Sequence, residues 1–150
     1  MLDKNLISRK LRRIIGFLNE LEPLTKITFD KYEADYLTKH ASERLIELVV
    51  ESAVDINTLL LVENGQSPPQ DYYSSFSDLT KLKVYPAEFV SKIAWTAGLR
   101  NRLAHEYEEI KDRKVYQAMK DFPKLYTAYI THIEKFIEPA KNHRHNGSSV

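Results

Sequence analysis

Residues 30 to 63 carry the longest regular pattern in the chain, with apolar or small side chains recurring at steps of three and four. This spacing places them along one face of an α-helix. The positions that form the stripe are Ala34, Leu37, Ala41, Leu45, Leu48, Ser52, Ile56 and Leu59. Further apolar residues widen it (Ile46, Val49, Val50, Ala53 and Leu60), which predicts burial on two sides in the C-terminal half. Asn64 and Gly65 then provide a helix stop.

The rest of the chain is also predicted to be helical. A first helix is expected from about Asp3 to Leu21, with the buried stripe Ile7, Leu11, Ile14, Leu18 and Leu21. A short helix is expected over residues 72–82, and Pro86 opens the next one. The last helix is expected to be capped by Asp112, kinked at Pro123 and buried along Val115, Met119, Phe122, Tyr126, Tyr129, Ile133 and Ile137. With no convincing strand, we predict an all-α fold, an antiparallel bundle of four to five helices.

Composition limits the remaining choices. The chain has 150 residues, which suits one helical domain over residues 1–140 and a flexible tail over residues 141–150. Lys and Arg number 22 against 21 Asp and Glu, so nucleic-acid binding would need a local basic patch. The absence of cysteine excludes disulfides and thiolate metal sites. No targeting or membrane-spanning segment is visible, so we expect a cytoplasmic protein without membrane contact.

One stretch is unlike a helical core: Gly98-Leu99-Arg100-Asn101-Arg102-Leu103-Ala104-His105-Glu106-Tyr107. On an unbroken helix Arg100 and His105 would lie about 140° apart, whereas Arg100 and Tyr107 would lie only about 20° apart. For Arg100 and His105 to converge on one substrate, the helix must end near residues 103–105, or a second copy of the chain must contribute.

These residue types suit the cleavage of RNA, whose ribose 2′-hydroxyl is a built-in nucleophile. Histidine titrates near neutral pH and can act as general base or acid, here His105. The guanidinium of Arg100 can stabilise the phosphate, and no metal or cofactor is required. Asn101 could orient the phosphate or the imidazole. Tyr107 could position a phosphate or be a target for modification.

The pattern Arg100-Asn101-x3-His105-x-Tyr107 resembles the Arg-x4-His-x-Tyr motif of the HEPN superfamily, in the form found in HepT toxins. The resemblance extends from about Leu2 to Ile137 and includes the segments 41–45 and 75–79. It implies a HEPN-like fold and a homodimer with the motif at a shared cleft. It also implies an RNase toxin of a type VII-like toxin–antitoxin system, acting on mRNA or tRNA. Its partner would be an MntA-like nucleotidyltransferase antitoxin that transfers AMP to Tyr107.

The leading hypothesis is therefore a metal-independent endoribonuclease with Arg100, His105 and Asn101 as catalytic residues. The alternative is a non-catalytic helical module that binds a nucleotide or its partner nucleotidyltransferase. A basic cluster early in the chain (Arg9, Lys10, Arg12 and Arg13) is either an RNA-binding patch or a solvated helix face. The same two readings apply to Arg102. Asp55, within an apolar run, is expected to make a structural polar contact or to be buried near the cleft.

Overall fold

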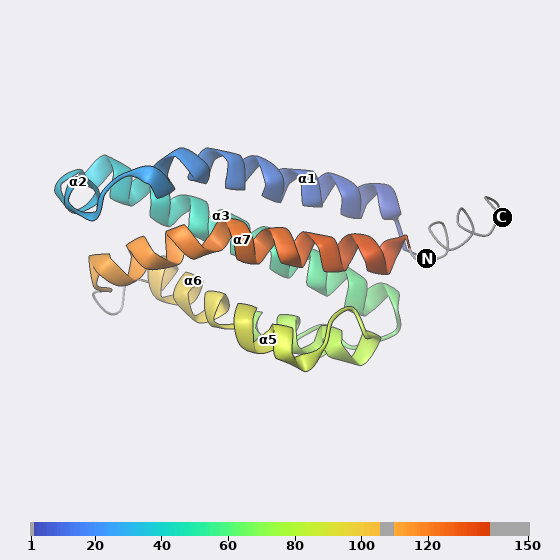
Figure 1. The fold of residues 1–150 in the computed structure, drawn as a ribbon. Coiled ribbons are helices and arrows are strands. Elements are labelled where there is room, and N and C mark those ends of the chain that lie inside the picture. Colours follow the sequence, from blue (N-terminus) through green and yellow to red (C-terminus); the bar gives the residue numbers. More distant parts are fainter. Residues whose placement is uncertain (1, 106–109, 139–150) are drawn as a thin grey trace.

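The fold is a helical bundle with four antiparallel legs, as predicted (Figure 1). It is a computed structural model that describes residues 2–105 and 110–138. The legs are α1 (Lys4–Leu21), α3 (Tyr36–Glu63), the consecutive pair α5 (Ala87–Ile93) and α6 (Trp95–His105), and α7 (Asp112–Ile137). Shorter elements connect them: the 3-10 helix η1 (Glu22–Lys26), α2 (Phe29–Ala34), α4 (Tyr72–Ser77) and the 3-10 helix η2 (Asp78–Leu82). The bundle is thus divided into more helices than the sequence predicted.

Side-chain caps fix several helix starts. Asp3 accepts a hydrogen bond from the Leu6 amide at 3.0 Å, and Thr28 accepts one from the Lys31 amide at 3.4 Å. Each bond satisfies an amide that has no partner within the helix. The start at Asp3 was predicted, as was the stop at residues 64 and 65, where Gly65 has a φ of 81°. The prediction for Asp112 was wrong.

Asp112 is the first residue of α7 and makes no cap bond. Its carboxylate instead accepts a hydrogen bond from Lys39 Nζ at 3.2 Å, which ties α7 to α3. Pro123 lies inside α7, and the helix runs on without a break. The predicted kink there stays a prediction.

The long helix predicted from residue 30 to 63 is interrupted at Asp35. Its backbone is extended, and its carboxylate accepts hydrogen bonds from the Leu37 amide at 3.0 Å and from Thr38 Oγ1 at 2.9 Å. Aspartate competes well for such capping bonds, so the chain ends α2 and starts α3 here. The spacing of apolar residues over residues 30–63 did not indicate this interruption.

The predicted stripe of α3 was also wrong in its first half. Ala34, Leu37 and Ala41 are exposed, with Leu37 at 67%, and Leu45, Leu48 and Ser52 are only half-buried. The buried face lies mainly on the rows that were expected only to widen the stripe: Ser42, Ile46, Val49, Val50, Ala53, Val54, Ile56, Asn57, Leu60 and Leu61. Because apolar residues occupy neighbouring rows of this helix, its packing partners decide which row is covered.

The stripes predicted for α1 and α7 are confirmed, since every residue named for them is buried. A buried polar network joins three helices beside this core. Tyr129 of α7 donates to Asn57 Oδ1 of α3 at 2.6 Å, and Asn57 Nδ2 donates to Ser75 Oγ of α4 at 3.1 Å. Ser75 Oγ donates in turn to the Tyr72 carbonyl at 2.8 Å. The network therefore fixes α4, and with it Tyr72, against the bundle.

Within residues 2–105 and 110–138, no helix has the length and apolar character needed to cross a membrane. The predicted domain boundary at residue 140 and the tail over 141–150 lie outside the described residues.

Candidate active site

Helix α6 is described from Trp95 to His105, and the next four residues lie outside the described part of the chain, so an end of the helix near residues 103–105 stays a prediction. Arg100 and His105 nevertheless belong to the same helix, so their side chains start about 140° apart around its axis and about 7.5 Å apart along it. His105 is exposed, whereas the Arg100 side chain is only 19% exposed. Tyr107 and the neighbouring Glu106, Glu108 and Glu109 lie outside the described residues.

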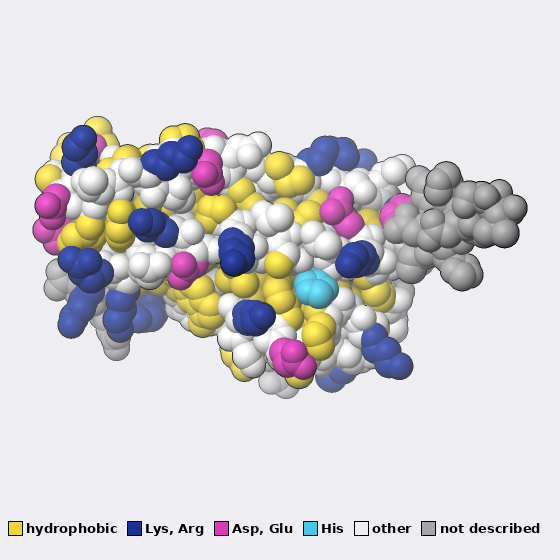
Figure 2. All heavy atoms as spheres, in the orientation of Figure 1, with side chains coloured by type: hydrophobic (Ala, Val, Ile, Leu, Met, Phe, Trp, Pro, Cys, Tyr) yellow, Lys and Arg dark blue, Asp and Glu magenta, His cyan; other side chains and the backbone are white. Residues whose placement is uncertain are grey.

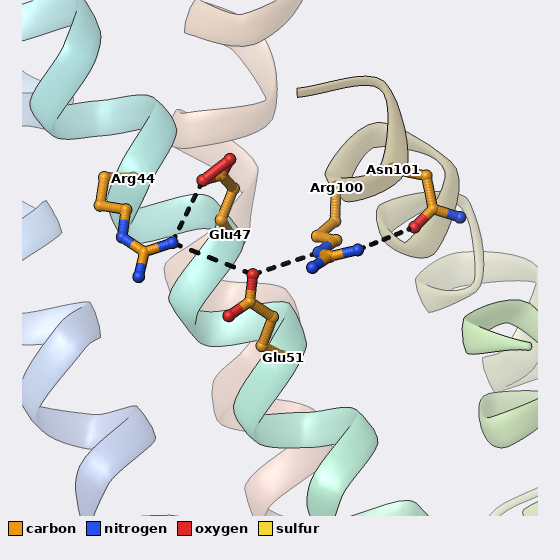
Figure 3. Close-up of polar contacts among 5 residues, drawn as sticks. All are labelled: Arg44, Glu47, Glu51, Arg100 and Asn101. Carbon is orange, nitrogen blue, oxygen red and sulfur yellow. Dashed lines mark hydrogen bonds and ion pairs between the residues drawn. The ribbon is translucent and has the colours of Figure 1, made fainter. Parts of the chain in front are cut away.

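Three groups hold the guanidinium of Arg100, and Figure 3 shows two of them, Glu51 and Asn101. Its Nε donates to Glu51 Oε2 of α3 at 3.2 Å, and its Nη1 donates to Asn101 Oδ1 at 3.3 Å. The guanidinium carbon lies 4.6 Å from the centre of the Tyr72 ring, a cation–π contact. Asn101 thus contacts Arg100, where the sequence suggested a phosphate or the imidazole. Among described residues Nη2 of Arg100 has no hydrogen-bond partner, so it can donate to a ligand.

Glu51 is shared between two arginines (Figure 3). Its carboxylate lies 3.2 Å from Arg100 and 4.0 Å from Arg44, and Arg44 also pairs with Glu47 at 3.4 Å. Carboxylates alternate with guanidinium groups along this row, which restrains each side chain more than an isolated pair would. The arrangement preorganises Arg100 before any substrate binds.

A groove of about 460 Å³ lies between α1 and α3 and reaches the partners of Arg100. We call it the α1–α3 groove; its lining residues are Leu6, Arg9, Lys10, Arg13, Leu48, Glu51, Ser52, Asp55 and Tyr72. The basic cluster is thereby divided, because Arg9 and Arg13 line the groove and Arg12 does not. Asp55 is 68% exposed and pairs with Lys10 Nζ at 3.3 Å, so it makes a polar contact and is not buried.

Arg102 belongs to a different surface. It lines a second groove of about 460 Å³ between α6 and α7, whose other lining residues are Trp95, Gly98, Leu99, Ile110, Lys114, Gln117, Ala118 and Asp121. Figure 2 shows hydrophobic atoms along the boundary between α7 and the α5–α6 pair. Residues that are two positions apart in a helix differ by about 200° in direction around its axis, so Arg100 and Arg102 point to nearly opposite sides of α6. The structure does not bring Arg102 together with Arg100.

Glu51 and Tyr72 are the site residues that the sequence did not reveal. Glu51 stands 49 positions before Arg100, and nothing in the local pattern links the two. Tyr72 follows Asp71, which caps α4 by accepting from the Ser74 amide at 2.7 Å. That cap predicts the helix start but not the contact with α6.

Most carboxylates of the site lie against cations and are not clustered. Within residues 2–105 and 110–138, no three His, Asp or Glu side chains are grouped in a way that could hold a metal ion. The arrangement therefore offers a restrained arginine, an exposed histidine on the same helix and a neighbouring cationic groove. These are components suited to binding and cleaving a phosphodiester.

Comparisons with known proteins identify the family of the chain. A family model described as ribonuclease HepT-like matches residues 8–138. A tRNA nuclease HepT of Aphanizomenon flos-aquae is 29% identical over 132 residues, which are 88% of this chain and 90% of that protein. A putative RNase of Archaeoglobus fulgidus is 28% identical over 89 residues, which are 59% of this chain and 67% of that protein.

Solved structures share the fold at low sequence identity. A tri-AMPylated HEPN toxin of Shewanella oneidensis, in complex with MNT antitoxin, superposes with a TM-score of 0.80 at 18% identity, covering 89% of this chain and 98% of that one. The cytosolic protein YutE of Bacillus subtilis, of unknown function, gives a TM-score of 0.60 at 18% identity, covering 82% and 90%. The fold is thus HEPN-like, and this chain belongs to the ribonuclease HepT-like family.

Proposed function

We propose that this protein is the toxin of a toxin–antitoxin pair, an endoribonuclease that cleaves tRNA or mRNA without a metal ion. The observation that carries the proposal is the restrained Arg100, whose Nη2 has no partner among the described residues, on the helix that also contains His105. Family membership and the HepT tRNA nuclease relative support an RNA substrate. A cytoplasmic location fits such a substrate.

The chemistry needs few protein groups. The ribose 2′-oxygen attacks the adjacent phosphorus while the bond from phosphorus to the 5′-oxygen of the next nucleotide breaks. A base removes the 2′-hydroxyl proton and an acid protonates the leaving oxygen; His105 serves as one of them. Arg100 stabilises the charge on the phosphate, and Asn101 orients the guanidinium of Arg100. No cofactor enters this scheme.

A homodimer completes the site in this proposal. Arg100 and His105 diverge on α6, so the complementary residue must come from a second copy for both to reach one phosphate. The α6–α7 groove supplies a surface for that contact, because its lining includes Leu99, Ile110 and Trp95, which is 41% exposed. Arg102 then lies at the rim of the dimer contact, where it can still reach RNA.

The antitoxin in the proposal is an MntA-like nucleotidyltransferase that transfers AMP from ATP to Tyr107. The solved complex of an AMPylated HEPN toxin with MNT antitoxin supports this pairing. AMP on Tyr107 would place a bulky anion near Arg100, where the substrate phosphate binds. Mass spectrometry of the chain co-expressed with its antitoxin should find AMP on Tyr107, and Tyr107→Phe should escape neutralisation. An unmodified chain that is still silenced would favour simple occlusion.

Induced expression with an RNA readout tests the catalytic proposal. Wild type should arrest growth, and its RNA cleavage should persist in the presence of a metal chelator. His105→Ala should lose RNA cleavage by about 10²–10⁴-fold. His40→Ala is the matched control, since His40 is an exposed histidine on α3 whose ring contacts Tyr36. Equal arrest by His105→Ala and wild type would refute the proposal. It would favour a non-catalytic module that binds a nucleotide or its partner enzyme.

A further inference from the structure

We propose that the α1–α3 groove binds the backbone of single-stranded RNA next to the cleaved phosphate, with Arg9 and Arg13 as phosphate ligands. The inference rests on the proposed function, because it takes the phosphate held by Arg100 as the point where the strand enters the groove. It assigns to the groove a separate role, which is affinity for flanking nucleotides.

The first argument is continuity between the groove and Arg100. Two of the groove's lining residues, Glu51 and Tyr72, are also the residues that hold the Arg100 guanidinium, at 3.2 Å and 4.6 Å. A strand whose phosphate contacts Arg100 therefore meets the groove directly. The groove's volume of about 460 Å³ is of the size that accommodates a small ligand or a nucleotide-sized segment.

The second argument is charge. The lining carries three cations, Arg9, Lys10 and Arg13, and two carboxylates, Glu51 and Asp55. Both carboxylates are already paired, Asp55 with Lys10 at 3.3 Å and Glu51 with Arg100 at 3.2 Å. Arg9 and Arg13 form no ion pair with any carboxylate in the described part of the chain, and the guanidinium carbon of Arg13 lies 5.7 Å from the centre of the Phe17 ring. Their positive charge is therefore available to phosphates.

The third argument is the arrangement of these groups. Arg9 and Arg13 are four residues apart, so they stand on one face of α1 about 6 Å apart along its axis. Two guanidinium groups in such a row can follow successive phosphates of one strand. Tyr72 adds an aromatic ring and Ser52 a hydroxyl to the same groove. Basic grooves with aromatic side chains are characteristic of single-stranded nucleic-acid sites.

Salt-dependent binding provides the test. Affinity is measured by fluorescence anisotropy on the full chain carrying His105→Ala, which prevents cleavage, with a labelled oligouridylate of about twelve nucleotides. Each neutralised phosphate contact lowers the slope of log affinity against log salt by about 0.7 for single strands. Arg9→Gln and Arg13→Gln each remove one contact and should each make the slope less negative by that amount, which corresponds to about a fourfold loss of affinity at 0.15 M salt. The double variant should lose about 14-fold.

Matched variants separate groove contacts from general charge effects. Lys124→Gln, an exposed lysine on α7, removes the same charge away from the groove and should leave affinity and slope unchanged. Arg12→Gln should have a smaller effect than its two neighbours, because Arg12 lies outside the groove lining. Asp55→Asn should tighten binding, because it removes a negative charge from the groove and releases Lys10. A merely structural role of the Lys10–Asp55 pair predicts no gain.

The outcomes distinguish the groove from the active site. If wild type cleaves RNA but Arg9→Gln and Arg13→Gln match Lys124→Gln in affinity and slope, the groove proposal is overturned and the proposed function stands. If the two variants keep RNA affinity but escape the antitoxin, the groove is a protein interface and the proposal is again overturned. If wild type cleaves no RNA at all, the proposed function is refuted and the groove proposal, which rests on it, is overturned with it.

Discussion

Separating Arg100 and His105 onto different chains should restore activity to a mixture of two inactive variants. The reason is the geometry of α6, which contains both residues and directs them about 140° apart. If one phosphate is served by Arg100 of one protomer and His105 of the other, each variant dimer lacks one partner at both sites. A heterodimer of Arg100→Ala and His105→Ala chains instead has one complete site.

The expected recovery follows from two-fold symmetry. Random mixing of equal amounts gives about half heterodimers, and one of the two sites in each is complete, so activity should reach about a quarter of wild type. Purified heterodimer, isolated through two different tags, should reach about half. The homodimeric variants should remain about 10²–10⁴-fold below wild type, the usual range for loss of an acid–base group or an electrostatic stabiliser.

Cleavage of a labelled RNA after co-expression of the two variants is the assay. Size-exclusion chromatography with light scattering must first show a dimer, because a chain that is a 17.5 kDa monomer in solution cannot form a site shared between two copies. Cross-tagged wild-type chains give the reference activity, and cross-tagged His105→Ala chains give the background. A heterodimer no more active than its parents would refute the reasoning, since both residues would then be needed from the same chain.

Three further predictions concern the bundle that carries the site. Tyr129→Phe should lower the free energy of unfolding in urea by about 1–3 kcal/mol, because Asn57 Oδ1 loses its 2.6 Å donor in a buried place; a loss under about 0.5 kcal/mol would contradict this. Ile46→Ala should cost about 2–5 kcal/mol and Leu37→Ala less than about 0.5, since Ile46 is buried and Leu37 is 67% exposed; equal costs would mean that the buried face of α3 is misassigned. Burial and Lys135 lower the pKa of His132 below 6.5, so the unfolded chain binds the proton more readily than the folded chain, and stability should fall as pH drops through 6.5. His132→Gln should weaken this dependence of the melting temperature on pH, and an unchanged dependence would contradict the assignment.

The sequence predicted α1 and α7 well because each has one clear apolar stripe. In α3 the apolar residues fill neighbouring rows, and a count of spacings cannot tell which row its neighbours will cover. The exposed Leu37 and the buried Ile46 show the consequence. The break at Asp35 has a similar origin, because a capping aspartate inside a periodic segment leaves the spacing unchanged on either side.

The motif proposed for the active site could be read from the sequence for a different reason, namely that its residues are close together in the chain. The partners of Arg100 were not predictable, since Glu51 is 49 residues away and its contact depends on how α3 packs against α6. The division of the basic cluster is likewise tertiary, because only the packing of α1 on α3 places Arg9 and Arg13 in the groove.

The position of Arg100 depends on the core of the bundle as well as on its own helix. Tyr72, whose ring lies under the guanidinium, is held through its carbonyl by Ser75, and Ser75 receives a hydrogen bond from Asn57. Asn57 is bonded in turn to Tyr129, so α3, α4 and α7 jointly place the ring. Glu51 reaches the same guanidinium from the outer side of α3. A buried network that is fully hydrogen-bonded has one preferred geometry, and here that geometry is transmitted to the residue proposed to bind phosphate. Packing of the core and preorganisation of the site are therefore set by the same contacts.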